Sequence, residues 1–407
     1  MNRVLCFAGR SHHRERLSPV VNALRARGVE CPYICTDNAI QLDPSSEYLI
    51  PAGEPFIDTL SVLESSNIQQ VTEMTHLMLN SIYSQVVELA EDITTFIPPF
   101  WISYSVREFC ELLVAVRKIY LKYKPDVVIG LHENNAFYRV FAYVCHEMGI
   151  PSVVFSEGIL RHRDQKTQGK QSLACEYSTK LFVWSDNMRQ AYIEAGISEE
   201  KVVTVGIPHM DYWFQAMKDP QWPLFKPSYK AQLGFNPDMP LVTFTLPILH
   251  RYEGSPMKAI GAVADWAANR FTQMAFSFHP FEGEENVKKV KDAIANHPYA
   301  KVVGGDVIPL LAASDLVLCQ HSTVAVECMA VGTPMAQIDL DNVGILESLS
   351  EQGVAHEIRE GQLNKILEIL EGKHILNYAM IEGWINTNVG PRDGRAVERV
   401  LAELERL

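Results

Sequence analysis

The feature that most constrains this chain is the alternation of short Val- and Ile-rich runs with segments of helical periodicity, which occurs in two separate series. The apolar runs of the first series are 4–8, 31–35, 125–131, 151–155, 180–184 and 201–205. Those of the second are 241–245, 273–278, 301–303, 316–318 and 334–338. Apolar strands that alternate with helices are typical of parallel sheets whose two faces are both covered. The sequence therefore predicts an α/β protein with two parallel sheets.

Two interruptions of the alternation define the predicted domain organisation. The 407 residues are enough for two cores of roughly 200 residues each. Residues 67–124 have long helical patterns, which predict a helical insertion in the first lobe. Between Pro208 and Pro240 the pattern gives way to Trp and Pro residues, as expected of a connection between lobes. The predicted parts are an N-terminal acceptor-binding lobe (1–207), a connection (208–239), a C-terminal nucleotide-sugar-binding lobe (240–390) and a C-terminal helix (391–407).

Composition excludes several classes of protein. The chain is 47% hydrophobic and 21% charged, which is typical of a folded globular protein. Its net charge of -13 argues against a nucleic-acid partner, because Lys and Arg must neutralise the phosphates. No apolar run reaches the ~18 residues of a membrane span, and no export signal is found, so we expect a cytoplasmic protein. The short apolar segment 96–102 is expected to pack in the core, with contact with the inner face of a membrane as the alternative.

Carboxylates follow two strands of the first series. Ligands of doubly wound sheets bind beyond the carboxyl ends of the strands, so polar residues at these ends are candidate site residues. Glu157 lies in Ser156-Glu157-Gly158 after the run 151–155, where it could act as a general base or as a nucleophile. A helix cap or a salt bridge is the alternative role. Glu133, which follows the run 125–131, is the reserve candidate for the base, and a solvated loop is its alternative.

The second series carries a predicted phosphate site. His279-Pro280 ends one strand, and an imidazole at a strand end suits a phosphate oxygen, although a purely structural His is the alternative. Ser322-Thr323 precede a helical pattern, and free N–H groups at a helix N-terminus favour an anion. Glu327 lies one turn further on, within reach of a ribose hydroxyl pair. The alternative for Ser322 or Thr323 is a simple helix cap.

Two loops of the first series are candidates for contacts with the acceptor. The loop Gly9–Arg14, which includes Arg10, and the loop that begins at His132 both follow strands of the first series, so both face the same crevice. They are predicted to contact the acceptor.

Asp339-Leu340-Asp341 matches an Asp-x-Asp metal pattern, but so short a match is expected by chance, and we predict no metal. Walker, GxGxxG and HExxH motifs are absent from the sequence.

Taken together, Ser156-Glu157-Gly158, His279-Pro280 and Ser322-Thr323 resemble elements of the bacterial GT-B glycosyltransferases that use CMP-activated acidic sugars. These are the sialyltransferases and the capsule or lipopolysaccharide Kdo (3-deoxy-manno-octulosonic acid) transferases. The resemblance implies two Rossmann-like lobes in the GT-B architecture and a C-terminal helix that crosses back onto the first lobe. It implies these roles: a catalytic carboxylate at Glu157, phosphate ligands at His279, Ser322 and Thr323, and a ribose contact at Glu327.

The resemblance also bears on the substrate. The family element usually has two acidic residues before the glycine, whereas the first of them is Ser156 here. The segment 157–161 is closer to the Kdo-transferase version, and Arg161 or Arg163 could pair with a sugar carboxylate. The implied partners are a CMP-linked nucleotide sugar and an oligosaccharide or glycolipid acceptor, with no metal cofactor. The alternatives are a UDP-, GDP- or CDP-dependent transferase, a UDP-GlcNAc 2-epimerase and a binding subunit without catalysis.

Overall fold

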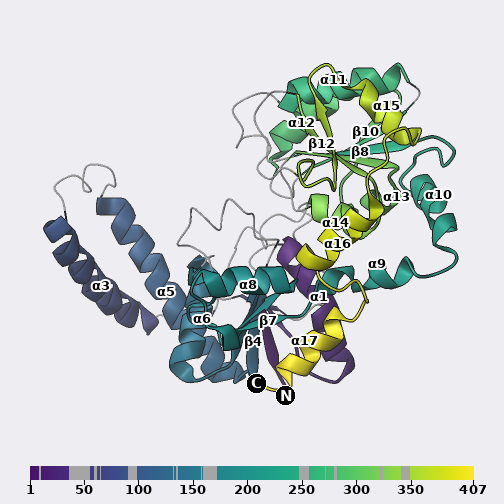
Figure 1. Ribbon diagram of the computed structural model, residues 1–407. Coiled ribbons are helices and arrows are strands. Elements are labelled where there is room, and N and C mark those ends of the chain that lie inside the picture. Colours follow the sequence, from purple (N-terminus) through teal and green to yellow (C-terminus); the bar gives the residue numbers. More distant parts are fainter. Residues whose placement is uncertain are drawn as a thin grey trace.

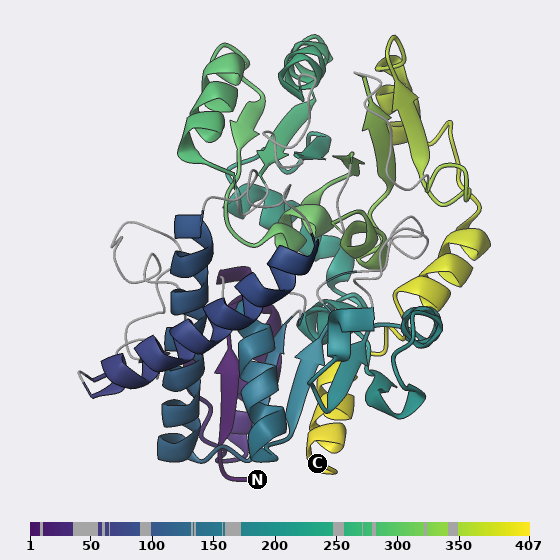
Figure 2. The ribbon, with the colours of Figure 1, turned by 90° about the vertical axis from the view of Figure 1, so that its left-hand side faces the viewer.

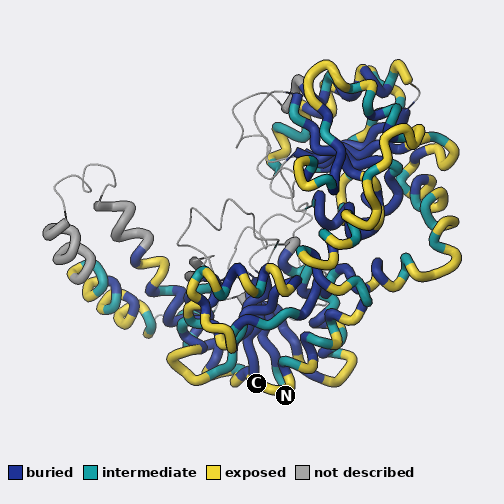
Figure 3. Tube along the Cα trace, in the orientation of Figure 1, coloured by how far each residue is buried: buried dark blue, intermediate teal, exposed yellow. Residues whose placement is uncertain are grey.

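The two apolar series fold into two parallel sheets, one in each lobe of the computed structural model (Figure 1). Buried residues are concentrated along the strands of each sheet (Figure 3). The structure describes residues 1–8, 11–35, 56–58, 62–64, 66–89, 99–131, 133, 136–156, 158, 172–246, 256–270, 272–278, 282–320, 324–340 and 349–407.

The first sheet has seven strands in the order β3-β2-β1-β4-β5-β6-β7. Their bounds are β1 Val4–Phe7, β2 Tyr33–Cys35, β3 Phe56–Asp58, β4 Val127–Leu131, β5 Ser152–Phe155, β6 Lys180–Val183 and β7 Val202–Thr204. The strand order reverses between β1 and β4, which pair in parallel with Val4 opposite Val127. In a doubly wound sheet, the crevice beyond such a reversal is where ligands bind. Strand β3 was not predicted from the sequence.

Helices of the first lobe include a pair that extends away from the sheet. The helices of this lobe are α1 Ser11–Ala26, α3 Asn67–Leu89, α5 Pro99–Tyr123, α6 Ala136–Met148 and α8 Asp186–Glu194, with short 3-10 helices η2 Ser172–Cys175 and η3 Glu199–Lys201. Figure 1 shows α3 and α5 side by side, projecting from the lobe. An apolar cluster that includes Val71, Val106, Cys110 and Val114 holds the two helices together. The predicted helical insertion is confirmed.

The second sheet has six strands in the order β10-β9-β8-β11-β12-β13. The strand bounds are β8 Leu241–Thr245, β9 Gln273–Ser277, β10 Ala300–Val302, β11 Leu316–Cys319, β12 Met335–Asp339 and β13 His356–Arg359. The helix bounds are α11 Pro256–Ala268, α12 Glu284–Ile294, α13 Val307–Ala313, α14 Val324–Ala330 and α15 Asn364–Leu370. This order reverses between β8 and β11, so a second crevice lies at their carboxyl ends. Strand β13 was not predicted.

The connection between the lobes contains helices that the sequence did not indicate. They are η4 Pro208–Met210, α9 Asp211–Ala216 and α10 Trp222–Gln232. Pro223 stands at the start of α10, where its missing N–H costs nothing, so a proline did not mean irregular structure here. Lys230 of α10 is buried, and its Nζ lies 2.6 Å from Asp315 Oδ2, while Lys226 Nζ lies 2.8 Å from Oδ1. Helix α10 is thereby fixed to the second lobe.

The C-terminal helices return to the first lobe, as predicted (Figure 2). Helix α16 (Tyr378–Asn388) contacts α8, and α17 (Ala396–Leu404) contacts α1. The carboxylate of Asp211 accepts hydrogen bonds from Ala396 N at 3.0 Å and Val397 N at 2.7 Å, which caps α17. Val400, Leu401 and Leu404 are buried in the same cluster as β1 residues. The domain boundaries 207, 239 and 390 stay predictions.

Candidate site between the lobes

A buried carboxylate of the second lobe meets two basic side chains from outside that lobe. Glu327 lies in the first turn of α14, the helix after β11. Its Oε1 is 3.2 Å from Arg16 Nη2 and 3.2 Å from His209 Nε2. Arg16 belongs to α1, which follows β1, and His209 belongs to η4, which follows β7. The contact therefore joins helices that begin beyond the carboxyl ends of strands in both sheets.

Electrostatics keep the Glu327 carboxylate charged. Burial acts to raise its pKa, but the hydrogen bond with His209 and the charge of Arg16 outweigh this, so the pKa is lowered. Burial lowers the pKa of His209, and the charge of Arg16 adds to that effect. His209 is therefore neutral near pH 7 and donates its Nε2–H to Glu327 in the matching tautomer.

One oxygen of Glu327 is left for a ligand. The described residues provide hydrogen-bond partners for Oε1 but none for Oε2. This oxygen can accept a hydrogen bond from a hydroxyl group of a ligand. The ribose contact assigned to Glu327 stays a prediction, and this geometry is compatible with it.

Arg14 is a second group that lacks a partner. It lies in the first turn of α1, in the segment predicted to contact the acceptor, and its Nη1 is buried with no hydrogen-bond partner among the described residues. A buried guanidinium nitrogen without an acceptor is costly. An anionic group of a ligand, such as a phosphate or a carboxylate, would provide that acceptor.

The segment predicted to carry the catalytic base follows β5, as expected. Ser156 Oγ donates a hydrogen bond to the carbonyl oxygen of Gly158 at 2.9 Å, and it lies 3.4 Å from Tyr192 Oη. This hydrogen bond links Ser156 to Gly158. Glu157 itself lies outside the described residues, and its catalytic role stays a prediction.

Glu133, the reserve candidate, is fully buried. Its Oε1 accepts a hydrogen bond from Tyr177 N at 2.8 Å, and its Oε2 accepts one from Ser178 N at 3.2 Å. The alternative interpretation as a solvated loop residue is wrong for this side chain. A general base must reach the proton that it abstracts, whereas this carboxylate binds the backbone that leads into β6. The arrangement favours a structural role for Glu133.

The other predicted site residues lie outside the described residues and stay predictions: Arg10, His132, Arg161, Arg163, His279, Pro280, Ser322 and Thr323. The elements beside them lie where they were predicted, with β9 and α14 each ending one residue earlier than expected. Strand β9 ends at Ser277, and α14 begins at Val324, directly after the Ser-Thr pair. Among the residues that are described, no group of three His, Cys, Asp or Glu side chains could hold a metal ion. Asp341 of the Asp-x-Asp pattern is not among them.

Two residues of the site were missed by the sequence analysis. His209 is a polar residue shortly after β7, so the rule that identified the other strand ends could have found it. It was assigned to the connection because of the prolines nearby. Arg16 gave no such signal, since a charged residue inside a helix is usually solvated and only the packing of the lobes directs it towards Glu327.

No family model and no curated protein matches the sequence. Solved structures do match it over its full length. The UDP-GlcNAc 2-epimerase from Neisseria meningitidis, bound to UDP-GlcNAc, is 13% identical with a TM-score of 0.62, and 100% of both chains is covered. The epimerase from Methanocaldococcus jannaschii, in complex with UDP-GlcNAc and UDP, is 15% identical with a TM-score of 0.60 and the same coverage. A glycosyltransferase from Rickettsia africae is 13% identical, with a TM-score of 0.52 over 100% of this chain and 99% of that one.

These identities are too low to transfer an activity, so the comparison concerns the fold. It supports the GT-B fold, and it does not single out the CMP-sugar transferases that the sequence motifs resemble. Among the helices that the structure describes, none has both the length and the apolarity to cross a membrane. The chain is a two-lobed α/β protein with two Rossmann-like lobes in the GT-B architecture.

Proposed function

We propose that the chain is a nucleotide-sugar enzyme that binds an activated sugar between its lobes and transfers the sugar to an acceptor. The observation that carries this proposal is the contact of Glu327 with Arg16 and His209. It brings a charged carboxylate with one unpaired oxygen to the crevice between two doubly wound sheets. Ligands of such sheets bind at the carboxyl ends of the strands, where this contact is found.

The nucleotide would occupy the second lobe. Glu327 Oε2 would accept hydrogen bonds from the ribose hydroxyl groups, while Ser322, Thr323 and His279 would contact the phosphate. Arg14 of the first lobe would supply a positive charge to the same phosphate or to a carboxylate of the sugar, because its Nη1 is buried and unpaired among the described residues. These donors would balance the phosphate charge without a metal ion.

The chemistry would require one carboxylate from the first lobe, and Glu157 is our candidate. As a general base, it would take the proton of an acceptor hydroxyl group. The acceptor oxygen then forms a bond to the anomeric carbon while the bond from that carbon to the nucleotide phosphate oxygen breaks. If the configuration of the sugar is retained, Glu157 would instead act as a nucleophile or stabilise the positive charge on the sugar.

The donor that we propose is a CMP-linked acidic sugar, Kdo or one similar to sialic acid, with an oligosaccharide or glycolipid as the acceptor. The support for it is the set of short motifs around Glu157, His279 and Ser322. Arg161 or Arg163 would bind the carboxylate of the sugar through a bidentate pair. A UDP-, GDP- or CDP-linked donor would use the same crevice.

An epimerase is the second candidate. The two epimerase structures described above have higher TM-scores than the glycosyltransferase, and each is covered completely. An epimerase changes its nucleotide sugar without an acceptor, so the products distinguish the two activities. Incubation with UDP-GlcNAc alone, followed by NMR of the sugar, detects epimerisation directly.

A comparison of four nucleotides tests whether the protein binds a nucleotide at the proposed site. A ligand that binds only the native state raises the melting temperature, so CMP, UDP, GDP and CDP are compared by thermal shift. We expect one nucleotide to stabilise the wild type and to stabilise Glu327→Gln less. Glu285→Gln, an exposed substitution in α12, is the matched control and should respond like the wild type. If no nucleotide stabilises the protein, or if Glu327→Gln responds like the control, the proposed nucleotide site is wrong.

A further inference from the structure

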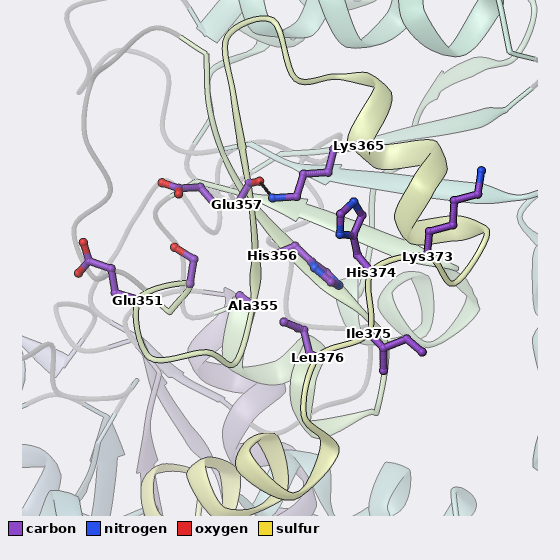
Figure 4. A pocket seen from close by; sticks show the side chains of 10 residues that line it. Glu351, Ala355, His356, Glu357, Lys365, Lys373, His374, Ile375 and Leu376 are labelled. Atoms are coloured by element: carbon purple, nitrogen blue, oxygen red, sulfur yellow. Dashed lines mark hydrogen bonds between the residues drawn. The ribbon is translucent and has the colours of Figure 1, made fainter.

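A separate cavity of about 510 Å³ lies in the second lobe, at the amino-terminal end of β13 (Figure 4). It is lined by the segment before β13, by the first turn of α15 and by the loop 373–376. The sheet is parallel, so this end of β13 lies opposite the carboxyl ends at which the interlobe site is built. A volume of this size is within the range of sites for small organic molecules.

His356 is the buried polar group of this cavity. It begins β13, and only 8% of its surface is exposed. Among the described residues, none forms a hydrogen bond with its ring nitrogens. The ring of His374 packs edge-on to it, with a centroid distance of 6.4 Å. The ring nitrogens of His356 are therefore available to donate to or accept from a ligand in the cavity.

Basic groups surround the same space. Lys365 Nζ donates one hydrogen bond to the carbonyl oxygen of Glu357 at 2.8 Å, which holds the ammonium group at the cavity and leaves further donors. Lys373 and His374 come from the adjacent loop, where they pair with Glu371 at 2.5 Å and Glu368 at 2.6 Å.

The two acidic residues that line the cavity do not oppose an anion at His356. Glu357 follows His356 in the strand, so its side chain points to the other face of the sheet, where it pairs with Arg359 at 2.8 Å. In Figure 4, the carboxylates of Glu351 and Glu357 lie on the side away from the two imidazoles. The end of the cavity at His356 is therefore lined by hydrogen-bond donors, and the ammonium group of Lys365 is bound there to a carbonyl oxygen and not to a carboxylate.

Apolar groups complete the lining. Ala355 and Leu376 contribute to the wall, and Ile375 has 88% of its surface exposed at the rim. Such a combination suits an organic molecule with one strongly anionic group. We propose that this cavity is a second ligand site that binds a small phosphate-bearing molecule of the size of a monosaccharide phosphate, with the phosphate at His356, Lys365 and His374.

Protonation provides a signature of this site. Burial lowers the pKa of His356 to about 4, and the charges of Lys365 and His374 add to the effect. The other charged groups at the cavity are Lys373 and the carboxylates of Glu351, Glu357, Glu368 and Glu371. A phosphate dianion beside the ring would favour the protonated imidazole and raise this pKa. Binding of the phosphate compound should therefore take up protons and become tighter as the pH falls from 8 to 6.

Calorimetric titration with glucose 6-phosphate tests the proposal, with glucose as the uncharged reference and inorganic phosphate as the bare anion. We expect glucose 6-phosphate to bind the wild type, and His356→Gln and Lys365→Gln to weaken this binding at least about tenfold. Inorganic phosphate should bind more weakly at the same site, and glucose should not bind. Lys289→Gln, an exposed substitution in α12, is the matched control and should bind as the wild type does.

The outcomes separate this site from the interlobe site. Binding of glucose 6-phosphate that persists under saturating nucleotide supports a second site, whereas competition with nucleotide overturns it. No binding to the wild type, or equal binding to His356→Gln, also overturns it. If His356→Gln does not fold, His374→Gln decides, because this exposed side chain can be replaced without disturbing the core. We expect His374→Gln to weaken binding several-fold, and an unchanged affinity would contradict the proposal.

Discussion

Arg16 Nη2 lies 3.2 Å from Glu327 Oε1, and this ion pair joins the first lobe to the second. Only 19% of the Arg16 side chain and 3% of the Glu327 side chain are exposed, so solvent screens the pair little. The same oxygen also contacts His209. A ligand that binds Glu327 therefore acts on the contact between the lobes, and nucleotide binding and lobe association should be coupled.

We expect Glu327→Gln to weaken both stability and nucleotide binding. The amide keeps the shape of the side chain but removes the negative charge that pairs with Arg16 and His209, and breaking a largely desolvated ion pair is destabilising. The expected loss is about 2–3 kcal/mol of unfolding free energy, measured by urea denaturation. Arg16→Gln should have a similar effect. Stability equal to that of the wild type in both variants would show that the pair contributes little.

Glu133 is expected to matter for folding more than for catalysis. Glu133→Ala leaves the N–H groups of Tyr177 and Ser178 without their acceptors, and each buried unsatisfied group costs about 1–3 kcal/mol. Glu133→Gln keeps one acceptor oxygen and should lose roughly half as much. Urea denaturation measures both losses. A folded Glu133→Gln with wild-type stability and a rate lowered more than about a hundredfold would return Glu133 to the catalytic role.

Gly390 is expected to tolerate no side chain where the chain crosses back to the first lobe. Its φ is +90°, and a Cβ atom there would lie 2.2 Å from the carbonyl oxygen of Trp184. Gly390→Ala should therefore destabilise the protein by about 2–4 kcal/mol. Gly372→Ala is the matched control, because its φ is +72° but no atom lies within 4 Å, so it should cost about 1 kcal/mol. Equal melting temperatures for the two variants would contradict the close contact at Trp184.

Stability should fall in mild acid because of His356. Its pKa is lowered to about 4 in the folded protein, against about 6.5 in an unfolded chain, so the unfolded chain binds more protons between these values. The free energy of unfolding is unaffected by the titration of His356 above pH 6.5. It decreases as the pH falls towards 4, by up to about 3 kcal/mol. Urea denaturation from pH 7.5 to 4.5 measures this loss. His356→Gln should show a smaller pH dependence in this range, and an identical dependence would contradict the assignment.

Most strands were predictable because each is an uninterrupted apolar run. The missed strands β3 and β13 lie at the edges of the sheets, where the sequences Phe56–Asp58 and His356–Arg359 include charged residues. An edge strand has only one neighbour and can carry polar side chains, so the apolar pattern is lost. Helices α9 and α10 were missed because prolines were interpreted only as breaks.

The site was predictable only where it depends on local order along the chain. Glu327 was identified because it lies one turn into the helix after a buried strand. Its contact with Arg16 depends on how the two lobes pack, and positions 311 residues apart carry no local signal of this. The burial of Glu133 was also not predictable, because its acceptor role depends on the backbone of Tyr177 and Ser178, which belongs to a later segment.

The most direct test of the proposed function is the rate of sugar transfer by Glu157→Gln, measured beside its binding of the nucleotide. Removal of a general base lowers the rate by about 10² to 10⁴ while binding is largely kept. We predict that Glu157→Gln binds nucleotide like the wild type and transfers sugar at a rate lowered by that factor. Near-normal turnover by Glu157→Gln would contradict the assignment of the catalytic carboxylate and, with it, the proposed transferase mechanism.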